Sequence, residues 1–533
     1  MSRGPARETC VERLSSAAVR VRLAELVGAL SLGIDLGFGQ PMEHVLRQCR
    51  IALRLAERVG LDEQGRADVY YTALLVNVGC HTDAHEQAKW FGDDIALKSG
   101  KYDHEFGSVG DLLATLKLLG SNNRPLHRFK IGIEFAIAGH REVDGMIASH
   151  AAMAEQLARD LRLTDGAVAG IASSYEQWDG KGWPGNLSGD AVPLAARIAQ
   201  LSEFVEVAHR TTGVDAAVAL ARKRAGKQFD PALARVLAEH AEAILADLDS
   251  AAWDAVIEAE PALAVTLSAD EFDAALLAIA TFVDLKSPYT LGHSAAVAEL
   301  AAAAATHLGL DAEEVQTVRR AALAHDFGRL GVSNAIWDKP GPLGAGEWER
   351  VRMAPYLTER MLRQSAALAP LGAVALQHRE RLDGTGYPRG LSGAAIARPA
   401  RVVGAADAYC AMREPRPYRD PLTPDTAARE LRVAVHAGHL DADAVEVVLT
   451  AAGHRAGRRR EGPAGLTPRE VEVLALVARG MSNREVAQRL LIAPKTAGNH
   501  VEHIYAKIGV SSRAAASLFA VRHGLLEDEA IAS

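Results

Sequence analysis

Four side chains in the second half of the chain are of the types that bind a divalent metal ion: His293, the adjacent pair His325 and Asp326, and Asp407. His325 and Asp326 lie in the apolar stretch AALAHDFG, where an imidazole beside a carboxylate is costly to bury unless something satisfies both. A mixed set of nitrogen and oxygen ligands suits Mn, Fe, Ni, Co or Zn better than Ca. Such an ion would polarise a phosphoryl oxygen and lower the pKa of a bound water, which favours attack on a phosphodiester.

The surrounding stretch resembles the HD-GYP subclass of HD-domain metal phosphohydrolases over residues 270–445. The resemblance rests on VDLKSPYTLGHS, ALAHDFGRLG, QHRERLDGTGYPRGLSG and ARVVGAADAY, which contain His293, His325, Asp326, Gly328, His378, Glu380 and Asp407. It implies that His378 joins the other four side chains as a metal ligand, and that Asp326 and Arg329 act in catalysis. It also implies a substrate loop with Asp383, Gly386, Tyr387 and Pro388, which would meet a cyclic dinucleotide or another phosphorylated small molecule.

Several substitutions separate this site from family members that hold two metal ions. Ala354 stands where those members carry a further histidine, and Arg379 replaces one of two paired histidines before Glu380. A guanidinium cannot bind a metal ion and would repel a second cation. Arg329 replaces the usual lysine and stays cationic, while Cys410 replaces a later aspartate. We therefore expect one divalent ion, Mn, Fe, Mg or similar, and both cyclic di-GMP hydrolysis and nucleotide sensing without turnover stay open.

The N-terminal half repeats the pattern of the second half. The segment YEQWDGKGWPGNLSG parallels HRERLDGTGYPRGLSG, and the step from His293 to His325, taken from His44, reaches Val76 and then Asn77. The matched pairs are Asp35 with Asp284, His44 with His293, His150 with Ala354, Ser174 with His378, and Glu203 with Asp407. We predict a tandem duplication, with a first copy at 1–250 that has lost the metal ligands and a second copy at 251–452.

The first copy also contains a dense run of side chains able to bind a metal ion. They are Cys80, His81, Asp83, His85, Glu86, Asp93 and Asp94, in a segment inserted relative to the second copy. A relocated metal site is one interpretation. The other is a solvated helix start whose polar side chains cap the backbone.

The C-terminal segment from Leu466 to Leu526 has apolar residues at helical spacing in four short blocks, which predicts four helices. Asn483 is expected to cap the second helix, and Pro494 suits the first turn of the third. The third helix buries Ala497, Val501, Ile504 and Ile508 in this prediction. It leaves Lys495, Thr496, Asn499, His500, His503 and Lys507 to contact phosphates and base edges of double-stranded DNA.

This segment resembles the LuxR-type helix-turn-helix along its length. The matches are LTPRE at Leu466, GMSNREVA at Gly480, Lys495-Thr496, Asn499-His500-Val501 and KIGV at Lys507. Ala493 stands where the family has a capping serine, a loss of about 1 kcal/mol, and Gly498 stands where a lysine is common. We expect groove binding weaker than that of a typical member, offset by pairing of two copies on DNA.

The composition sets the remaining limits. Hydrophobic residues make up 49% of 533 residues and aromatic residues 5%, which together with abundant alanine favours an all-α protein. The net charge of −8 hides a basic C-terminal end, because Gly465 to Leu526 has eight Lys or Arg against four Asp or Glu. Four widely spaced cysteines, Cys10, Cys49, Cys80 and Cys410, indicate reduced thiols, and no long apolar run or signal core is present, so we expect a cytoplasmic protein with no membrane contact.

The expected architecture is two helical HD-type bundles, a flexible basic linker at 453–465 and a DNA-binding domain at 466–533. The leading hypothesis is a transcriptional regulator that binds DNA as a homodimer and is controlled by a metal- and nucleotide-binding region. A metal-dependent cyclic di-GMP phosphodiesterase that the DNA-binding domain only localises is the main alternative. An interaction scaffold that uses the loops around Tyr387 and Trp183 is the third.

Overall fold

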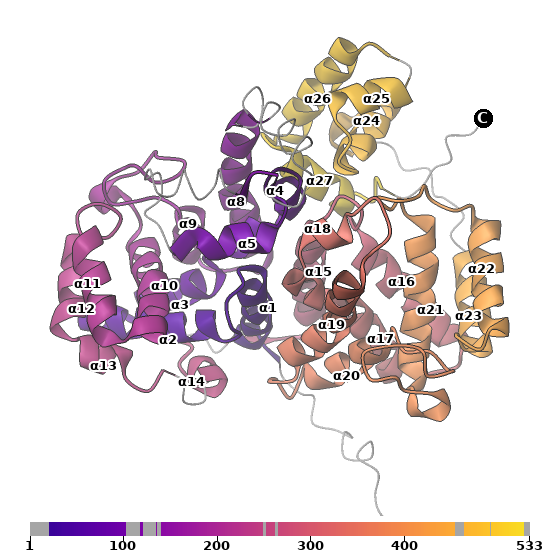
Figure 1. Ribbon diagram of the computed structural model, residues 1–533, viewed down its shortest axis with the longest axis horizontal. Helices are drawn as coiled ribbons and strands as arrows, with labels where there is room; N and C mark the ends of the chain where they lie inside the picture. The colour runs from indigo at the N-terminus through magenta and orange to yellow at the C-terminus, as the bar shows by residue number, and fades with distance from the viewer. Residues whose placement is uncertain are drawn as a thin grey trace, which may run out of the picture.

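The computed structural model describes residues 21–102, 118–120, 135, 140–248, 252–261, 265–453, 463–490 and 492–526. Within these residues the chain is helical, apart from one short antiparallel pairing of β1 with β2. Figure 1 shows two helical bundles beside each other, with the C-terminal helices above their junction. The all-α class expected from the sequence is therefore confirmed. Most of the predicted linker, at 454–462, and Cys10 lie outside the described residues.

The first bundle takes up residues 21–258 and begins at the short strand. Its elements are β1 (Val21–Arg22), α1 (Leu23–Gly37), α2 (His44–Arg58), α3 (Glu63–Leu75), η2 (Val78–His81), α4 (Ala84–Phe91), α5 (Asp94–Ser99), η3 (Gly100–Tyr102), α8 (His140–Asp160), α9 (Asp165–Ala172), η5 (Gly189–Ala191), α10 (Leu194–Thr212), α11 (Val214–Arg224), α12 (Pro231–Glu239), α13 (Ala241–Leu245) and α14 (Ala252–Glu258).

The second bundle repeats the order of long helices, 3₁₀ turns and loops. Its elements are β2 (Thr266–Leu267), α15 (Ala269–Asp284), α16 (His293–His307), α17 (Ala312–Ala324), η6 (Phe327–Gly331), α18 (Asn334–Trp337), α19 (Ala345–Leu362), α20 (Ala369–Gln377), η7 (Gly393–Ala395), α21 (Arg398–Arg413), α22 (Pro424–His436) and α23 (Ala442–Gly453). No helix in the described part of the chain combines the length and apolar character needed to cross a membrane.

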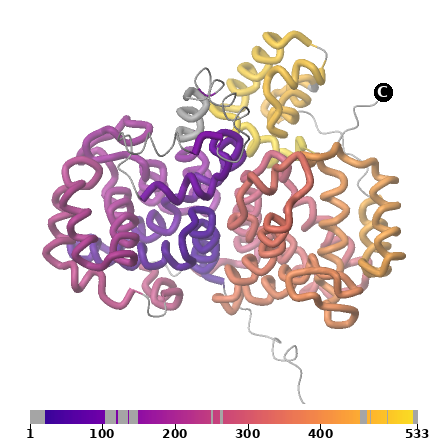
Figure 2. Tube along the Cα trace, viewed as in Figure 1, coloured from indigo at the N-terminus to yellow at the C-terminus, as the bar shows by residue number. Residues whose placement is uncertain are grey.

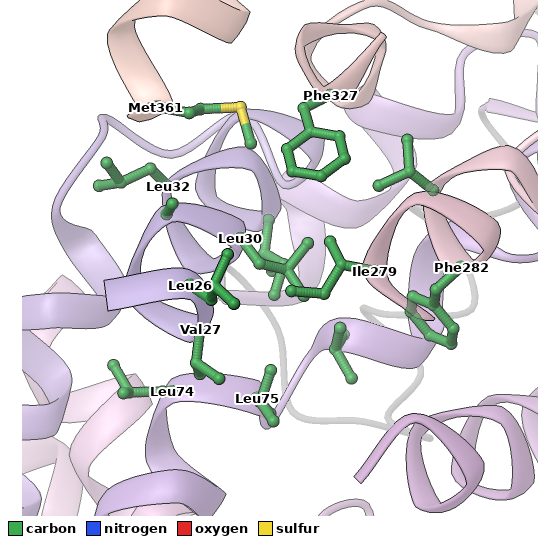
Figure 3. Packing of buried hydrophobic residues seen from close by; sticks show 14 of the residues in the cluster. Leu26, Val27, Leu30, Leu32, Leu74, Leu75, Ile279, Phe282, Phe327 and Met361 are labelled. Atoms are coloured by element: carbon green, nitrogen blue, oxygen red, sulfur yellow. The ribbon is translucent and has the colours of Figure 1, made fainter. Parts of the chain in front are cut away.

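The two bundles are joined by one continuous hydrophobic core. Leu26 and Leu30 of α1 pack toward Ile279 of α15 and Phe327 of η6, as Figure 3 shows. A Cβ atom at Gly33 of α1 would lie 2.6 Å from the terminal methyl of Met361, so the absence of a side chain at Gly33 leaves room for Met361 of α19. The first bundle therefore directly supports η6, the turn that follows His325 and Asp326.

The C-terminal domain has its own small core, which includes Leu474, Val486, Val501 and Ile504. Its elements are η8 (Pro463–Gly465), α24 (Pro468–Ala478), α25 (Asn483–Arg489), α26 (Pro494–Ile508) and α27 (Arg513–Arg522). The four helices match those predicted from the spacing of apolar residues.

The cap predicted for α25 is wrong by one residue. Ser482, not Asn483, is the N-cap: its hydroxyl accepts a hydrogen bond from the Glu485 N–H at 3.4 Å. The Glu485 carboxylate accepts the Ser482 N–H at 2.7 Å in return, so this reciprocal capping box stabilises the helix start one residue earlier. Ala493 is the N-cap of α26 and provides no side-chain hydrogen bond.

Candidate functional site

The five side chains expected to bind a metal ion come together at one buried centre in the second bundle. His293 begins α16, His325 and Asp326 lie between α17 and η6, His378 follows α20, and Asp407 lies within α21. Each of the five is at most 5% exposed. Two overlapping sets, His293 with His325 and Asp326, and His325 with His378 and Asp407, place one ligand atom from each residue within 4.8 Å of the others.

The distances between these ligand atoms suit a bound cation. His325 Nε2 lies 3.7 Å from Asp326 Oδ2, and His378 Nε2 lies 3.9 Å from Asp407 Oδ2. These gaps are too long for hydrogen bonds. They fit two atoms that each lie about 2.1 Å from one shared ion.

Two of the histidines are neutral, and each can offer one ring nitrogen to a metal ion. The Nδ1 atoms of His325 and His378 contact the carbonyls of Ala322 and Ala375 at 2.6 and 2.5 Å, which assigns the ring proton to Nδ1 and leaves Nε2 as an acceptor. Burial lowers the pKa of His378 to about 3 and also lowers the pKa of His325. The buried His325 Nε2 has no hydrogen-bond partner, and an unsatisfied nitrogen of this kind fits a metal ligand.

His293 differs from the other two histidines because a carboxylate holds its second nitrogen. Burial alone would lower its pKa, but Glu414, whose Oε2 lies 2.9 Å from Nδ1, together with Asp407 raises that pKa to about 10. Glu414 orients the ring from the end of α21, as a carboxylate behind a metal-binding histidine does. The sequence prediction missed Glu414, because nothing in the sequence separates it from the many surface glutamates.

An internal cation, Arg379, occupies the edge of this centre. Its Nε donates to His378 Nε2 at 3.0 Å, and its Nη2 lies 3.0 Å from Asp407 Oδ2. The sequence had indicated only that Arg379 would repel a second metal ion. In the structure the guanidinium also engages two of the five expected ligands, so we expect it to compete with the first ion as well.

Arg329 and Ala354 have separate structural roles near Asp326. Arg329 Nη1 lies 3.2 Å from Asp326 Oδ2, and the guanidinium lies 4.0 Å from the centre of the Trp337 ring, which fixes its position. A Cβ atom at Gly328 would lie 2.0 Å from the Ala354 carbonyl oxygen. The turn after the His325–Asp326 pair therefore rests directly on α19.

The loop predicted to meet a substrate is held beside Arg379. Glu380 accepts the backbone N–H groups of Arg389 at 2.7 Å and Leu391 at 2.9 Å, and the Tyr387 N–H donates to the Arg379 carbonyl at 3.2 Å. Asp383 is exposed and accepts the Thr385 N–H at 3.0 Å, so it shapes its own turn. Contact of Asp383, Gly386, Tyr387 and Pro388 with a substrate stays a prediction.

The first bundle contains the same supporting contacts around a centre without the ligand set. Asp35 accepts the backbone N–H at the second residue of α2 at 3.0 Å, as Asp284 accepts that of Ser294 in α16 at 2.9 Å. A Cβ atom at Gly79 would lie 2.2 Å from the carbonyl oxygen of His150, the residue matched with Ala354. These contacts recur at the offsets predicted from the sequence, so the repeat with a degenerate first copy is confirmed.

In the first copy, a lysine contacts two of the residues that match the expected metal ligands of the second copy. Lys101 Nζ lies 2.8 Å from Glu203 Oε1 and 2.9 Å from Asn77 Oδ1. Glu203 and Asn77 stand where the second copy has Asp407 and Asp326. The ammonium satisfies the buried carboxylate without a metal ion.

The structure bears out only part of the capping interpretation for the acidic and histidine-rich run between Cys80 and Asp94: the Asp93 carboxylate accepts the N–H groups of Ile95 and Ala96 at the start of α5. All residues of the run are described, and no three of them bring ligand atoms to one point. Cys80, His81, Asp83 and Asp94 are buried instead of solvated: Asp94 lies 3.2 Å from Lys286 Nζ and accepts the Ser333 hydroxyl at 2.7 Å. His81 Nε2 contacts the Phe282 carbonyl at 3.0 Å. These side chains tie the first bundle to the second.

Five of the six side chains expected to contact DNA are exposed along α26: Lys495, Thr496, Asn499, His503 and Lys507. His500 is half-buried, which places it at the edge of this surface. Lys507 Nζ, however, lies 2.7 Å from Glu470 Oε2 and donates to the Gly465 carbonyl at 3.2 Å. Lys507 therefore stabilises the domain in this structure, and its contact with phosphate stays a prediction.

The C-terminal domain is docked on both bundles through α27. Leu518 is 6% exposed and belongs to the core shared by the bundles. Arg522 forms an ion pair with Asp160 of α8, and a Cβ atom at Gly480 would lie 2.8 Å from Pro288 Cβ in the second bundle. Figure 2 shows this domain over the junction, with α26 on its outer side as labelled in Figure 1.

Both the helical bundles and the C-terminal domain match known protein families. Residues 140–233 and 278–444 match the family described as HD domain, and residues 464–520 match bacterial regulatory proteins of the luxR family. The 3'3'-cGAMP-specific phosphodiesterase 3 of Vibrio cholerae is 32% identical over 424 residues, which cover 78% of this chain and 91% of that protein. A cyclic di-GMP phosphodiesterase of Thermotoga maritima is 34% identical over 30% of this chain and 45% of that protein.

A solved structure agrees with these sequence comparisons. The crystal structure of a cyclic GMP-AMP-specific phosphodiesterase of Vibrio cholerae superposes with a TM-score of 0.56 at 28% identity, covering 82% of this chain and 98% of that one. HD domains are metal-dependent phosphohydrolases, which agrees with the buried ligand set. The chain belongs to the HD-domain family, in its HD-GYP subclass, with a degenerate first copy and a C-terminal LuxR-type helix-turn-helix domain.

Proposed function

We propose that this protein is a DNA-binding transcriptional regulator whose second HD copy binds one divalent metal ion and a cyclic dinucleotide. Ligand binding there changes how the LuxR-type domain engages DNA, with two copies pairing on the duplex. Such control requires a ligand that prefers one arrangement of the domains over another. Docking of the helix-turn-helix domain beside the metal centre is the observation that carries the proposal.

A short chain of contacts connects the docked domain to the metal centre. Gly480 packs against Pro288, and the carbonyl of the next residue, Tyr289, accepts a hydrogen bond from Arg416. Arg416 lies 3.0 Å from Glu414, which in turn lies 2.9 Å from His293 Nδ1. A ligand that moves His293 therefore acts on the segment that the DNA-binding domain rests on.

When bound, the ion would supply a Lewis acid at the centre made by His293, His325, Asp326, His378 and Asp407. The chain's own groups have the remaining roles. His325 and His378 present neutral nitrogens, and Glu414 orients His293. Arg329, a fixed cation beside Asp326, is placed to bind a phosphate group of the nucleotide.

The test measures affinity for DNA fragments that the full chain selects from genomic DNA, with and without Mn²⁺ plus 3'3'-cGAMP or cyclic di-GMP. We expect the ligands to change the affinity of the wild-type chain about 5- to 150-fold, the usual range of coupling between sites. Asp160→Arg, which sets a like charge against Arg522, should reduce that change, whereas Glu258→Arg, the same change at an exposed site, should not. The proposal would be refuted if neither nucleotide changes the affinity of the wild-type chain for DNA, or if the chain does not bind DNA at all.

Lys495→Ala should weaken binding to every duplex and reduce the slope of log affinity against log salt by about 1, because one phosphate contact is lost. Asn499→Ala should instead relax the preference for particular bases. Anisotropy titrations at several salt concentrations measure both effects, with the exposed Arg350→Ala as the charge-matched control. An unchanged salt slope for Lys495→Ala would remove α26 from the DNA interface.

A cyclic-dinucleotide phosphodiesterase is the second candidate function. The intact set of five ligands and the relative in Vibrio cholerae favour it, while Arg379 and Ala354 oppose a two-metal centre. Purified protein supplied with Mn²⁺ or Fe²⁺ should hydrolyse 3'3'-cGAMP or cyclic di-GMP if this function holds. Turnover no greater than that of His325→Ala leaves nucleotide sensing without hydrolysis.

A further inference from the structure

The degenerate first copy contains a cluster of reactive side chains outside the metal centre. Cys80, in η2, stands where the second copy has Arg329. Its Sγ lies 3.8 Å from His150 Nδ1 and 2.7 Å from the Tyr175 hydroxyl. On the opposite side of the imidazole ring, His150 Nε2 lies 2.5 Å from Asp83 Oδ2. All but Tyr175 are at least nine-tenths buried.

These residues form a relay of nucleophile, base and orienting carboxylate. The sulfur faces one nitrogen of His150 and the carboxylate faces the other, so Asp83 holds the ring in the orientation that serves Cys80. The three side chains come from two separate segments, and none of them contacts the metal centre of the second copy. A cysteine that only fills space in a core does not require an imidazole and a carboxylate beside its sulfur.

The charges around the sulfur stabilise a thiolate. Burial raises the pKa of Cys80, but the positive charge of His150, its hydrogen bond, and Lys101 together bring that pKa below the usual value of a thiol. Cys80 and Asp83 raise the pKa of His150 to about 10 against the effect of burial. Cys49, in the same bundle, provides the contrast: burial alone raises its pKa. Tyr175 and Glu203 complete the titratable groups around this pair.

We propose that Cys80 is a reactive thiolate that a small hydroperoxide oxidises to a sulfenic acid. The sulfur attacks one peroxide oxygen, an S–O bond forms, and the O–O bond breaks. The sulfur loses two electrons and the peroxide gains them. With hydrogen peroxide, the departing hydroxide takes a proton from the His150 imidazolium and leaves as water, so the products are Cys80 sulfenic acid, water and neutral His150.

The depth of the site restricts the oxidant to small molecules. Cys80 is 8% exposed, so a peroxide of about the size of water fits where larger electrophiles are excluded. The next residue, His81, contacts the Phe282 carbonyl of α15. The modified sulfur would therefore adjoin the junction of the two bundles, and oxidation adds an oxygen and removes the charge that pairs with His150.

The thiolate is tested first, on the full chain at about pH 7. The ultraviolet absorbance specific to thiolates should be higher in the wild type than in Cys80→Ser. Cys49→Ser is the matched control and should change nothing, because its thiol stays protonated. Equal absorbance of wild type and Cys80→Ser overturns the proposal.

The oxidation is tested with hydrogen peroxide on the folded chain. The peroxide is then removed, the chain is unfolded in the presence of dimedone so that the reagent reaches any buried sulfenic acid, and peptide mass spectrometry locates the adduct. We expect the adduct at Cys80 and not at Cys49, at a rate that rises less steeply from about pH 6 to pH 8 than that of an ordinary thiol, which reacts about tenfold faster per pH unit in this range. His150→Gln and Asp83→Asn should slow the reaction about tenfold or more at pH 7. Two results with the wild-type chain alone would overturn the proposal. One is the absence of a dimedone adduct at Cys80, and the other is a reaction rate that rises with pH as steeply as that of an ordinary thiol.

Discussion

Arg379→Ala is expected to tighten binding of a divalent metal ion at the second copy by about a hundredfold. The guanidinium lies 3.0 Å from Asp407 Oδ2 and donates to His378 Nε2 at 3.0 Å, so it repels an incoming cation and engages two ligands. Two unit charges about 4 Å apart interact by about 4 kcal/mol at the effective dielectric constant of a protein site. The Arg379 side chain is 33% exposed, and solvent screening reduces this to about 3 kcal/mol, or about a hundredfold in affinity.

Isothermal titration with Mn²⁺ at fixed pH and ionic strength measures the change. Arg381→Ala removes the same charge from an exposed position two residues away and serves as the control. Without metal, Arg379→Ala should unfold at a lower temperature than the wild type, because the Asp407 carboxylate loses its counter-ion. Mn²⁺ should restore that stability. Equal Mn²⁺ affinities for Arg379→Ala and Arg381→Ala would show that the guanidinium does not compete with the ion.

Gly328→Ala is expected to lower the free energy of unfolding by about 3 kcal/mol. The new Cβ atom would lie 2.0 Å from the Ala354 carbonyl and 2.7 Å from the Thr358 nitrogen, both backbone atoms of α19 that have no room to move. Relief requires η6 to shift away from α19. Because Asp326 lies two residues before Gly328, the same shift should weaken metal binding.

Chemical denaturation of the full chain, followed by circular dichroism, measures this loss. Gly341→Ala is the matched control, since its Cβ atom would meet nothing within 4 Å. A denaturation midpoint for Gly328→Ala equal to that for Gly341→Ala would mean that η6 and α19 are not held together as closely as the structure has them.

The metal ligands could be predicted from the sequence because their chemistry is carried by residue type. Burying an imidazole beside a carboxylate costs free energy unless a partner satisfies both groups. His325 and Asp326 lie in an apolar stretch, so the sequence alone indicated that a metal ion satisfies them. Glu414 and Lys101 carry no such signal. Each is an ordinary charged residue until the fold brings it to within hydrogen-bond distance of His293 or of Glu203 and Asn77.

The helices of the C-terminal domain could also be predicted from the sequence, although one N-cap was placed one residue too late. Apolar spacing located all four helices of the C-terminal domain, because a helix buries every third or fourth residue regardless of what lies further along the chain. The cap of α25 was misplaced because Ser482 and Asn483 are adjacent residues that both favour this position. Only the reciprocal bond with Glu485 selects Ser482.

The sequence by itself determined the helical class, the duplication, the candidate metal ligands and the helix-turn-helix, since each depends on residue type and on spacing along a single segment. Only the tertiary structure decided that Arg379 engages the ligands, that Cys80 meets His150, and that α27 docks over the junction. These contacts join segments far apart in the chain. Their distances are set by the angles at which helices pack, which local patterns of residues do not encode.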